Sequence, residues 1–143
     1  MKKNVRRGLA IVGASLLMVL INSNVAVARF SNSCTRYRVD HQGNMTASCQ
    51  NNAGQVVETS IALRQTVGCG QSGRLFWNLN GNYHRHCTEC DVVYDPPRDS
   101  VLLKCKCRPP NNPDAQRVNT TLNLEEPGFN IVNDDGQLRY AAP

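Results

Sequence analysis

Apolar residues in most of this chain come in short runs, and the 3.6-residue spacing of a long amphipathic helix is missing. The runs cover residues 56–57, 61–63, 75–77, 92–94, 101–103 and 118–124. Clusters of Gly, Asn, Asp, Pro and Ser separate them, at residues 40–44, 51–54, 68–73, 95–97 and 109–114. This pattern predicts short strands joined by hairpins.

The order of short motifs in the first half of the chain returns in the second half. The offset grows from 53 to 58, 61 and 63 at the pairs Cys34/Cys87, Cys49/Cys107, Leu63/Leu124 and Trp77/Tyr140. A steadily growing offset is expected if the second copy carries a few loop insertions, and such a period indicates duplicated structural units. We therefore expect one all-β domain over residues 29–143, built from two similar halves at about 29–80 and 81–143.

The first 28 residues have the layout of a secretory signal peptide. Lys2, Lys3, Arg6 and Arg7 precede an apolar run at residues 9–21, and Ala26-Val27-Ala28 follows as a small-x-small cleavage site. The run has 13 residues, fewer than the roughly 20 that a spanning helix needs. We expect a secreted or periplasmic protein whose mature part does not insert into a membrane; an uncleaved N-terminal anchor is the alternative.

The positive charge of the chain belongs largely to this leader. The full chain carries 16 Lys and Arg against 11 Asp and Glu, a net charge of +5. Removing the four leader cations leaves 12 against 11, or +1. Only Lys104, Lys106 and Arg108 cluster among the rest, so we do not expect a nucleic-acid partner.

All seven cysteines lie after the leader. An exported chain of this size meets an oxidising compartment, where disulfides commonly stabilise a small core. Cys34 and Cys49 bracket a hairpin-sized segment of 14 residues. A bond between them would contribute roughly 3 kcal/mol through loop entropy.

The other cysteines allow more than one arrangement. Antiparallel arms favour the nested bonds Cys87–Cys107 and Cys90–Cys105, with the crossed bonds Cys87–Cys105 and Cys90–Cys107 as the alternative. Cys69 is left without a partner. The four thiols of Cys87, Cys90, Cys105 and Cys107 would also match the ligand count of a zinc site. Behind a signal peptide we favour disulfides and expect no metal.

Three short motifs of the first half and one at the closing corner of the second half form a recognisable series. F-S-x-x-C occurs at residues 30–34, L-x-A-x-C (with Met for Leu) at 45–49, T-S-I-x-L at 59–63 and N-x-D-G-x-L-x-Y at 133–140. Together they resemble the cyanovirin-N homology family of carbohydrate-binding proteins. The resemblance spans nearly all of residues 29–143 and keeps its order in both halves.

The resemblance implies a pseudo-symmetric fold whose halves exchange strands and bind glycans, mannose-type ones foremost, near opposite ends. Each site joins the opening of one half and the residues after its second cysteine to the closing corner of the other half. The first site would use Arg29, Asn32, Ser33, Gln50, Asn52, Asn133, Asp134 and Asp135. Their amides and carboxylates suit sugar hydroxyls, which both donate and accept. The alternative is that several of these residues only form turns.

The corresponding second site departs from the family pattern. Its corner at residues 69–73 has no carboxylate, and Pro109 and Pro110 remove two backbone donors. Its candidate residues are Ser72, Asn82, Arg85, His86 and Arg108. We expect this end to bind sugar weakly, to bind a different sugar or to be silent.

Catalytic and metal-binding alternatives have less support. The acidic pairs at 125–126 and 134–135 are adjacent in sequence, so on a strand their side chains would point to opposite faces. His84 and His86 alternate on an expected strand, but the third histidine, His41, is distant in sequence. We expect a non-enzymatic lectin without cofactor, a monomer or weak dimer whose partners are glycans or glycoproteins. A protein–protein adhesion module on the same scaffold is the runner-up.

Overall fold

The computed structural model describes residues 29–129 and 131–141, so the predicted leader lies outside the described residues. The strands are β1 (Cys34–Val39), β2 (Met45–Gln50), β3 (Val56–Ile61), β4 (Val67–Cys69), β5 (Leu75–Trp77), β6 (Cys87–Asp95), β7 (Ser100–Cys107), β8 (Val118–Asn123), β9 (Ile131–Asp134) and β10 (Gln137–Tyr140). Short 3-10 helices occur at η1 (Phe30–Asn32), η2 (Leu63–Gln65), η3 (Tyr83–Arg85) and η4 (Pro96–Arg98). The all-β prediction is confirmed. Over the described ranges, none of the helices has the length and hydropathy needed to cross a bilayer.

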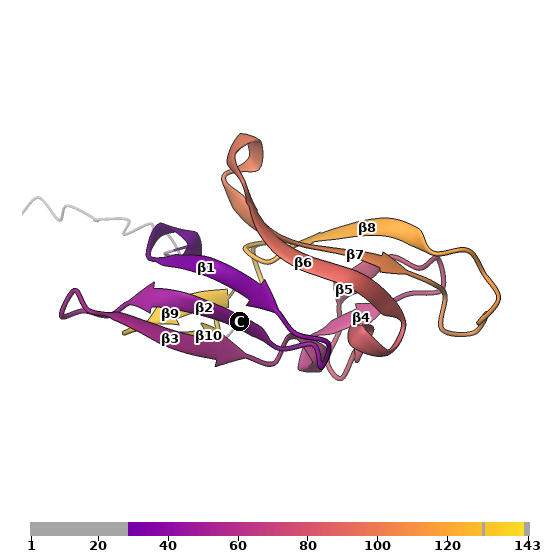
Figure 1. Cartoon of the computed structure of the whole chain (residues 1–143), viewed down its shortest axis with the longest axis horizontal. Coiled ribbons are helices and arrows are strands. Elements are labelled where there is room, and N and C mark those ends of the chain that lie inside the picture. Colours follow the sequence, from indigo (N-terminus) through magenta and orange to yellow (C-terminus); the bar gives the residue numbers. More distant parts are fainter. Residues whose placement is uncertain (1–28, 130, 142–143) are drawn as a thin grey trace, which may run out of the picture.

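The strands form two three-stranded antiparallel sheets and two hairpins, and the hairpins are exchanged between the halves. One sheet has the order β1-β2-β3 and the other β6-β7-β8. The β9–β10 hairpin of the second half lies beside the first sheet, and the β4–β5 hairpin of the first half lies beside the second sheet (Figure 1). The predicted intertwined halves are therefore present.

The same side-chain bond attaches each exchanged hairpin to its host sheet. The amide of Leu138 in β10 donates to Thr59 Oγ1 in β3 over 3.1 Å. The amide of Leu75 in β5 donates to Thr120 Oγ1 in β8 over 2.9 Å. Both threonines are buried, so each bond satisfies a polar group that would otherwise be costly to bury.

The core is formed by strand faces that alternate as the sequence pattern requires. Leu103, Cys105 and Cys107 of β7 are buried, whereas the intervening Lys104 and Lys106 are exposed. This is the period of two that places alternate side chains on opposite faces of a sheet. Matched positions of the two halves fill the centre: Phe30 and Tyr83, like Leu63 and Leu124, are at most 1% exposed.

Three disulfides join the arms of the hairpins in the nested order. They are Cys34–Cys49, Cys87–Cys107 and Cys90–Cys105. Within each pair the two residues lie 4.0 or 4.1 Å apart between Cα atoms. The crossed alternative is wrong, and the four-thiolate zinc interpretation is excluded because these sulfurs are bonded to each other.

Cys69 is the one cysteine of the described residues that keeps a free thiol, and it is buried. Its sulfur lies within 4.8 Å of those of Cys87 and Cys107. Burial raises the pKa of this thiol, so near neutral pH it stays protonated, the form that is a poor nucleophile.

Two glycines fix the corners of the exchanged hairpins. Gly136 has φ +84° and Gly73 has φ +74°, a backbone conformation that favours glycine. A Cβ added to Gly136 would lie 2.5 Å from Val57 Cγ2, and one added to Gly73 would lie 2.9 Å from Val118 Cγ2. Each corner therefore packs directly against the host sheet, which positions the sites described next.

Candidate functional site

The side-chain amide of Asn133 joins three separate segments at the first end of the molecule. Its Nδ2 donates to Ser33 Oγ and to the carbonyl of Gln50, both over 2.8 Å. Its Oδ1 accepts from the amide of Gly136, also over 2.8 Å. The opening segment, the end of β2 and the β9–β10 corner are therefore held in one fixed arrangement.

Asp135 and Gln50 present polar groups to solvent beside this junction. Asp135 Oδ1 accepts from the amide of Asn52 over 2.8 Å, and the residue is exposed. Within the described part of the chain, the other carboxylate oxygen of Asp135 has no hydrogen bond. Gln50 is exposed too, and its Nε2 donates to the carbonyl of Gly54 over 3.3 Å. Acceptors and donors thus lie side by side on a rigid backbone.

The structure brings together five of the eight residues predicted for the first site: Ser33, Gln50, Asn52, Asn133 and Asp135. Asn32 is exposed and lies next to Ser33 in η1. Asp134 forms an ion pair with Arg139 of its own hairpin, at 3.3 Å from Arg139 Nε.

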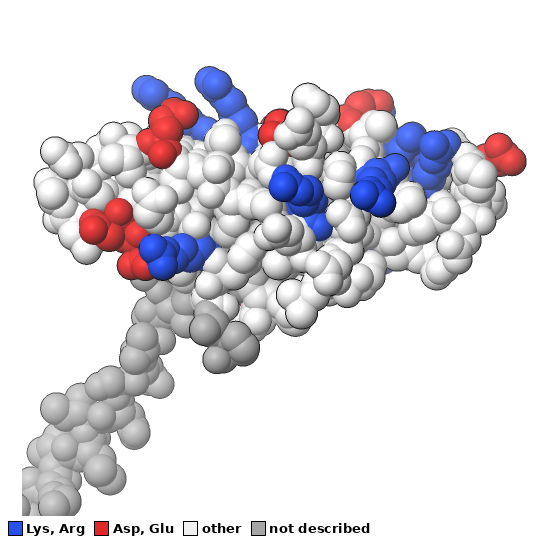
Figure 2. All heavy atoms as spheres, turned by 90° about the horizontal axis from the view of Figure 1, so that it is seen from below, with Lys and Arg blue, Asp and Glu red and all other residues white. Residues whose placement is uncertain are grey.

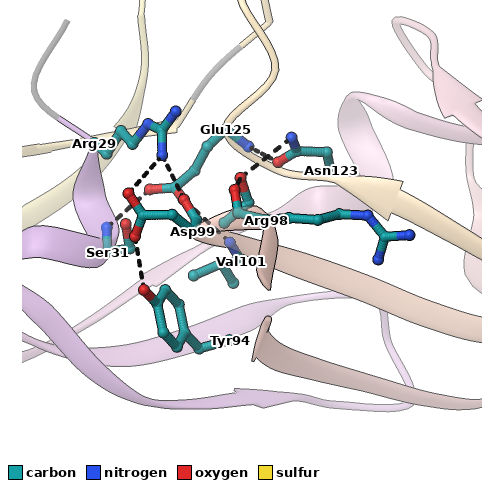
Figure 3. Close-up of polar contacts among 9 residues, drawn as sticks. Arg29, Ser31, Tyr94, Arg98, Asp99, Val101, Asn123 and Glu125 are labelled. Carbon is teal, nitrogen blue, oxygen red and sulfur yellow. Dashed lines mark hydrogen bonds and ion pairs between the residues drawn. The ribbon is translucent and has the colours of Figure 1, made fainter. Parts of the chain in front are cut away.

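Arg29 takes part in a different polar cluster (Figure 3). Its Nη1 lies 3.0 Å from Asp99 Oδ2 and also donates to the carbonyl of Asp99. Tyr94 Oη donates to the other carboxylate oxygen of Asp99 over 2.6 Å. Arg29 thus connects the start of the domain to the turn between β6 and β7.

Glu125, which the sequence shows only as one member of an adjacent acidic pair, is a buried carboxylate. It is 7% exposed. Its Oε1 accepts from the amide of Ser31 over 2.9 Å and its Oε2 from the amide of Val101 over 3.1 Å (Figure 3). These partners are 94 and 24 residues away in sequence, so no local sequence motif indicates the role of Glu125.

The second end has the same backbone connection with different side chains. The carbonyl of His86 accepts from the amide of Arg108 over 3.1 Å, as the carbonyl of Ser33 accepts from the amide of Gln50 over 2.8 Å. Gly70 occupies the position of Asn133, and a different side-chain bond ties this corner: Asn111 Nδ2 donates to Gln71 Oε1 over 3.0 Å. Ser72 lies in the β4–β5 turn, and Asn82 precedes η3 with φ +49°.

The histidines of this end do not alternate on one strand as expected. Tyr83–Arg85 forms the 3-10 helix η3, which places His84 in a helix and His86 after it. His84 Nδ1 is buried and has no hydrogen-bond partner among the described residues. Burial, followed by the charges of Arg85 and Arg64, lowers the pKa of His84, while Asp40 acts in the opposite direction.

This pKa shift predicts a pH-dependent stability. The unfolded chain binds a proton at position 84 more readily than the folded chain, so stability should fall as the pH drops through the ordinary pKa of histidine. We expect the melting temperature to decrease between pH 7.5 and 5 in the wild type and to decrease less in His84→Gln. Equal decreases in both proteins, measured by circular dichroism, would contradict this role of His84.

Comparisons with known proteins agree with the architecture. The CVNH domain profile matches residues 30–139. The Gibberella zeae CVNH protein is 23% identical with a TM-score of 0.62, covering 79% of this chain and 97% of that one. Microvirin, solved as a mannobiose complex, is 24% identical with a TM-score of 0.61, covering 79% and 98%. A MoCVNH3 variant in complex with (N-GlcNAc)4 is 15% identical with a TM-score of 0.61, covering 78% and 96%. The search of curated proteins finds no match.

Proposed function

We propose that this chain, which belongs to the CVNH domain family, is a lectin that binds uncharged oligosaccharides at its first end. The observation that best supports this proposal is the corner where Asn133 holds Ser33 and Gln50 beside the exposed carboxylate of Asp135. In this proposal Asp135 accepts from two sugar hydroxyls, and the amide and carbonyl of the Gln50 side chain contact a third.

The proposal derives its specificity from fixed geometry. A sugar ring presents pairs of hydroxyls at set angles, and an ionised carboxylate accepts from two of them more strongly than a neutral group does. Because Asn133 and the amide of Asn52 already hold the corner, little side-chain freedom remains to be lost on binding. The exposed position of Asp135 and Gln50 favours modest affinity at a single site, with tight binding through multivalent glycans.

Mannose-type glycans are our first candidate ligands, supported by the family resemblance and by the mannobiose complex of microvirin. N-acetylglucosamine oligomers come second, since the MoCVNH3 variant was solved with one. We propose that the protein acts by binding alone, without a cofactor, and that it is exported with residues 1–28 removed. The three disulfides fit an oxidising compartment.

A glycan array followed by calorimetric titration tests the proposal. We expect binding to mannose-type or N-acetylglucosamine oligosaccharides with one uncharged-sugar site per chain. Failure to bind any neutral oligosaccharide would refute it. Binding to a glycoprotein that survives enzymatic removal of its glycans would favour the protein–protein adhesion alternative.

A further inference from the structure

The two ends of the molecule use the same backbone positions for side chains of opposite character. The offsets of the two halves place Arg85, His86 and Arg108 at the positions of Asn32, Ser33 and Gln50. The shared bond between the last two positions, Ser33 to Gln50 and His86 to Arg108, shows that they are equivalent in space as well. Three neutral polar side chains of the first end are thus replaced by two arginines and a histidine.

The carboxylate and the amide of the first corner are replaced too. Ser72 stands in place of Asp135, and Gly70 in place of Asn133. The second corner therefore lacks the carboxylate and the asparagine amide that the first corner offers to a neutral sugar. The arginines of the second end supply N–H donors instead.

Two further arginines belong to the segments that meet at this end. Arg117 Nη1 donates to the carbonyl of His86 over 2.9 Å, which puts the guanidinium beside the shared backbone bond. Arg74 follows the β4–β5 turn, and that turn packs against Cys107 and Pro109 through Gly73. We call Arg74, Arg85, Arg108 and Arg117 the basic end.

The four arginines of the basic end form no ion pair within the described residues, because none has an Asp or Glu oxygen within 4.0 Å. Glu89, by contrast, pairs with Lys106 at 2.7 Å. The right-hand half of Figure 2, which holds the β6–β8 sheet in Figure 1, shows blue Lys and Arg side chains on the face in view, with red Asp and Glu side chains at its upper margin and right-hand edge.

A hollow adjoins the basic end. It has a volume of about 580 Å³ and lies between β5 and β8, lined by Ser72, Arg74, Leu75, Val118, Asn119, Thr120 and Thr121. This volume is in the range of small-ligand sites. Its hydroxyl and amide groups suit the body of a sugar, while the arginines suit an acidic substituent.

We propose that the basic end is a second glycan site that binds acidic oligosaccharides, whose sugars carry sulfate or carboxylate groups. This inference rests on the proposed lectin function and assigns a different ligand class to the second end. The planar guanidinium donates two parallel N–H bonds that match the oxygens of a carboxylate or sulfate. Arg108 is oriented by its own bond from Nη1 to the carbonyl of Pro113, 2.6 Å long, which leaves its other donors for a ligand.

The test is a calorimetric titration of the isolated protein with three oligosaccharides of equal length: a sulfated one, a hexuronate and a neutral mannose oligomer. We expect at least one acidic ligand to bind, and its affinity to fall with added salt because exposed charges are screened. Arg85→Gln and Arg108→Gln should each weaken acidic binding about tenfold, the loss of a charged hydrogen bond. Arg85 is exposed and makes no side-chain bond within the described ranges, so Arg85→Gln should leave the fold unchanged.

Arg38→Gln is the matched control, since Arg38 is an exposed arginine of β1 without an ion pair in the described structure. It should not change acidic binding. The proposal would be overturned if neither acidic ligand binds, if Arg38→Gln weakens binding as much as Arg85→Gln, or if single-stranded DNA of equal charge binds equally well. The neutral oligomer separates the two hypotheses: its failure to bind counts against the first site, and failure of both acidic ligands counts against the second.

Discussion

Replacing Asp135 with alanine is expected to weaken binding of an uncharged oligosaccharide about 100-fold. The change removes the carboxylate oxygen that faces solvent and the acceptor for the amide of Asn52. Charged hydrogen bonds contribute about 1.5–3 kcal/mol each, and about 2.7 kcal/mol corresponds to a factor of 100 in affinity. Calorimetric titration with the best ligand from the glycan array would measure the loss.

Two variants separate the causes of this loss. Asp135 has φ +49°, a conformation that asparagine tolerates better than alanine does. Asp135→Asn therefore removes the charge with little backbone strain and should weaken binding about tenfold. Ser72→Ala changes the equivalent position of the other end and should leave neutral-sugar affinity unaltered. Unchanged binding by Asp135→Ala would remove this residue from the site.

Replacing Glu125 with alanine is expected to give the largest loss of stability among the changes considered. The carboxylate accepts from two backbone amides, those of Ser31 and Val101. Its removal leaves the buried amide of Val101 and the part-buried amide of Ser31 without a partner, at about 1–3 kcal/mol each. We expect the free energy of unfolding to fall by about 2–5 kcal/mol, measured by urea denaturation.

The neighbouring acid provides the control. Glu126 is exposed, so Glu126→Ala should change the free energy of unfolding by less than about 0.5 kcal/mol. Glu125→Gln keeps the shape of the side chain but turns one acceptor into a donor that faces a backbone N–H. Its loss of unfolding free energy should lie between those of Glu126→Ala and Glu125→Ala. A loss below about 1 kcal/mol in Glu125→Ala would show that water can replace the carboxylate.

The fold followed from the sequence because its determinants are local or repeated. The apolar run at residues 75–77 became β5 with the same bounds. The alternation of lysines with apolar residues and cysteines in β7 fixed which face is buried. The nested disulfides followed from antiparallel arms, since the register pairs Cys87 with Cys107 and Cys34 with Cys49.

The candidate site was predictable only where the partners lie in or directly beside the short motifs that carry the family resemblance. Ser33, Gln50 and Asn133 meet as expected because each lies at a fixed place in a motif. Arg29, by contrast, pairs with Asp99, which is 70 residues away in sequence. Asp99 lies at the tip of the β6–β7 hairpin, whose strands are longer than the apolar runs at 92–94 and 101–103 indicated. His84 was misplaced because a single turn of 3-10 helix leaves no periodic signal.

The exchange of hairpins has a consequence for the origin of the fold. Because Leu138 bonds to Thr59 and Leu75 bonds to Thr120, each half covers its core with a segment supplied by the other. An ancestor consisting of one half would have closed its core only by trading hairpins with a second molecule of itself. On this view, joining the two halves in one chain removes the need for a partner molecule and leaves the side chains of the two ends free to differ, as Asp135 and Ser72 do.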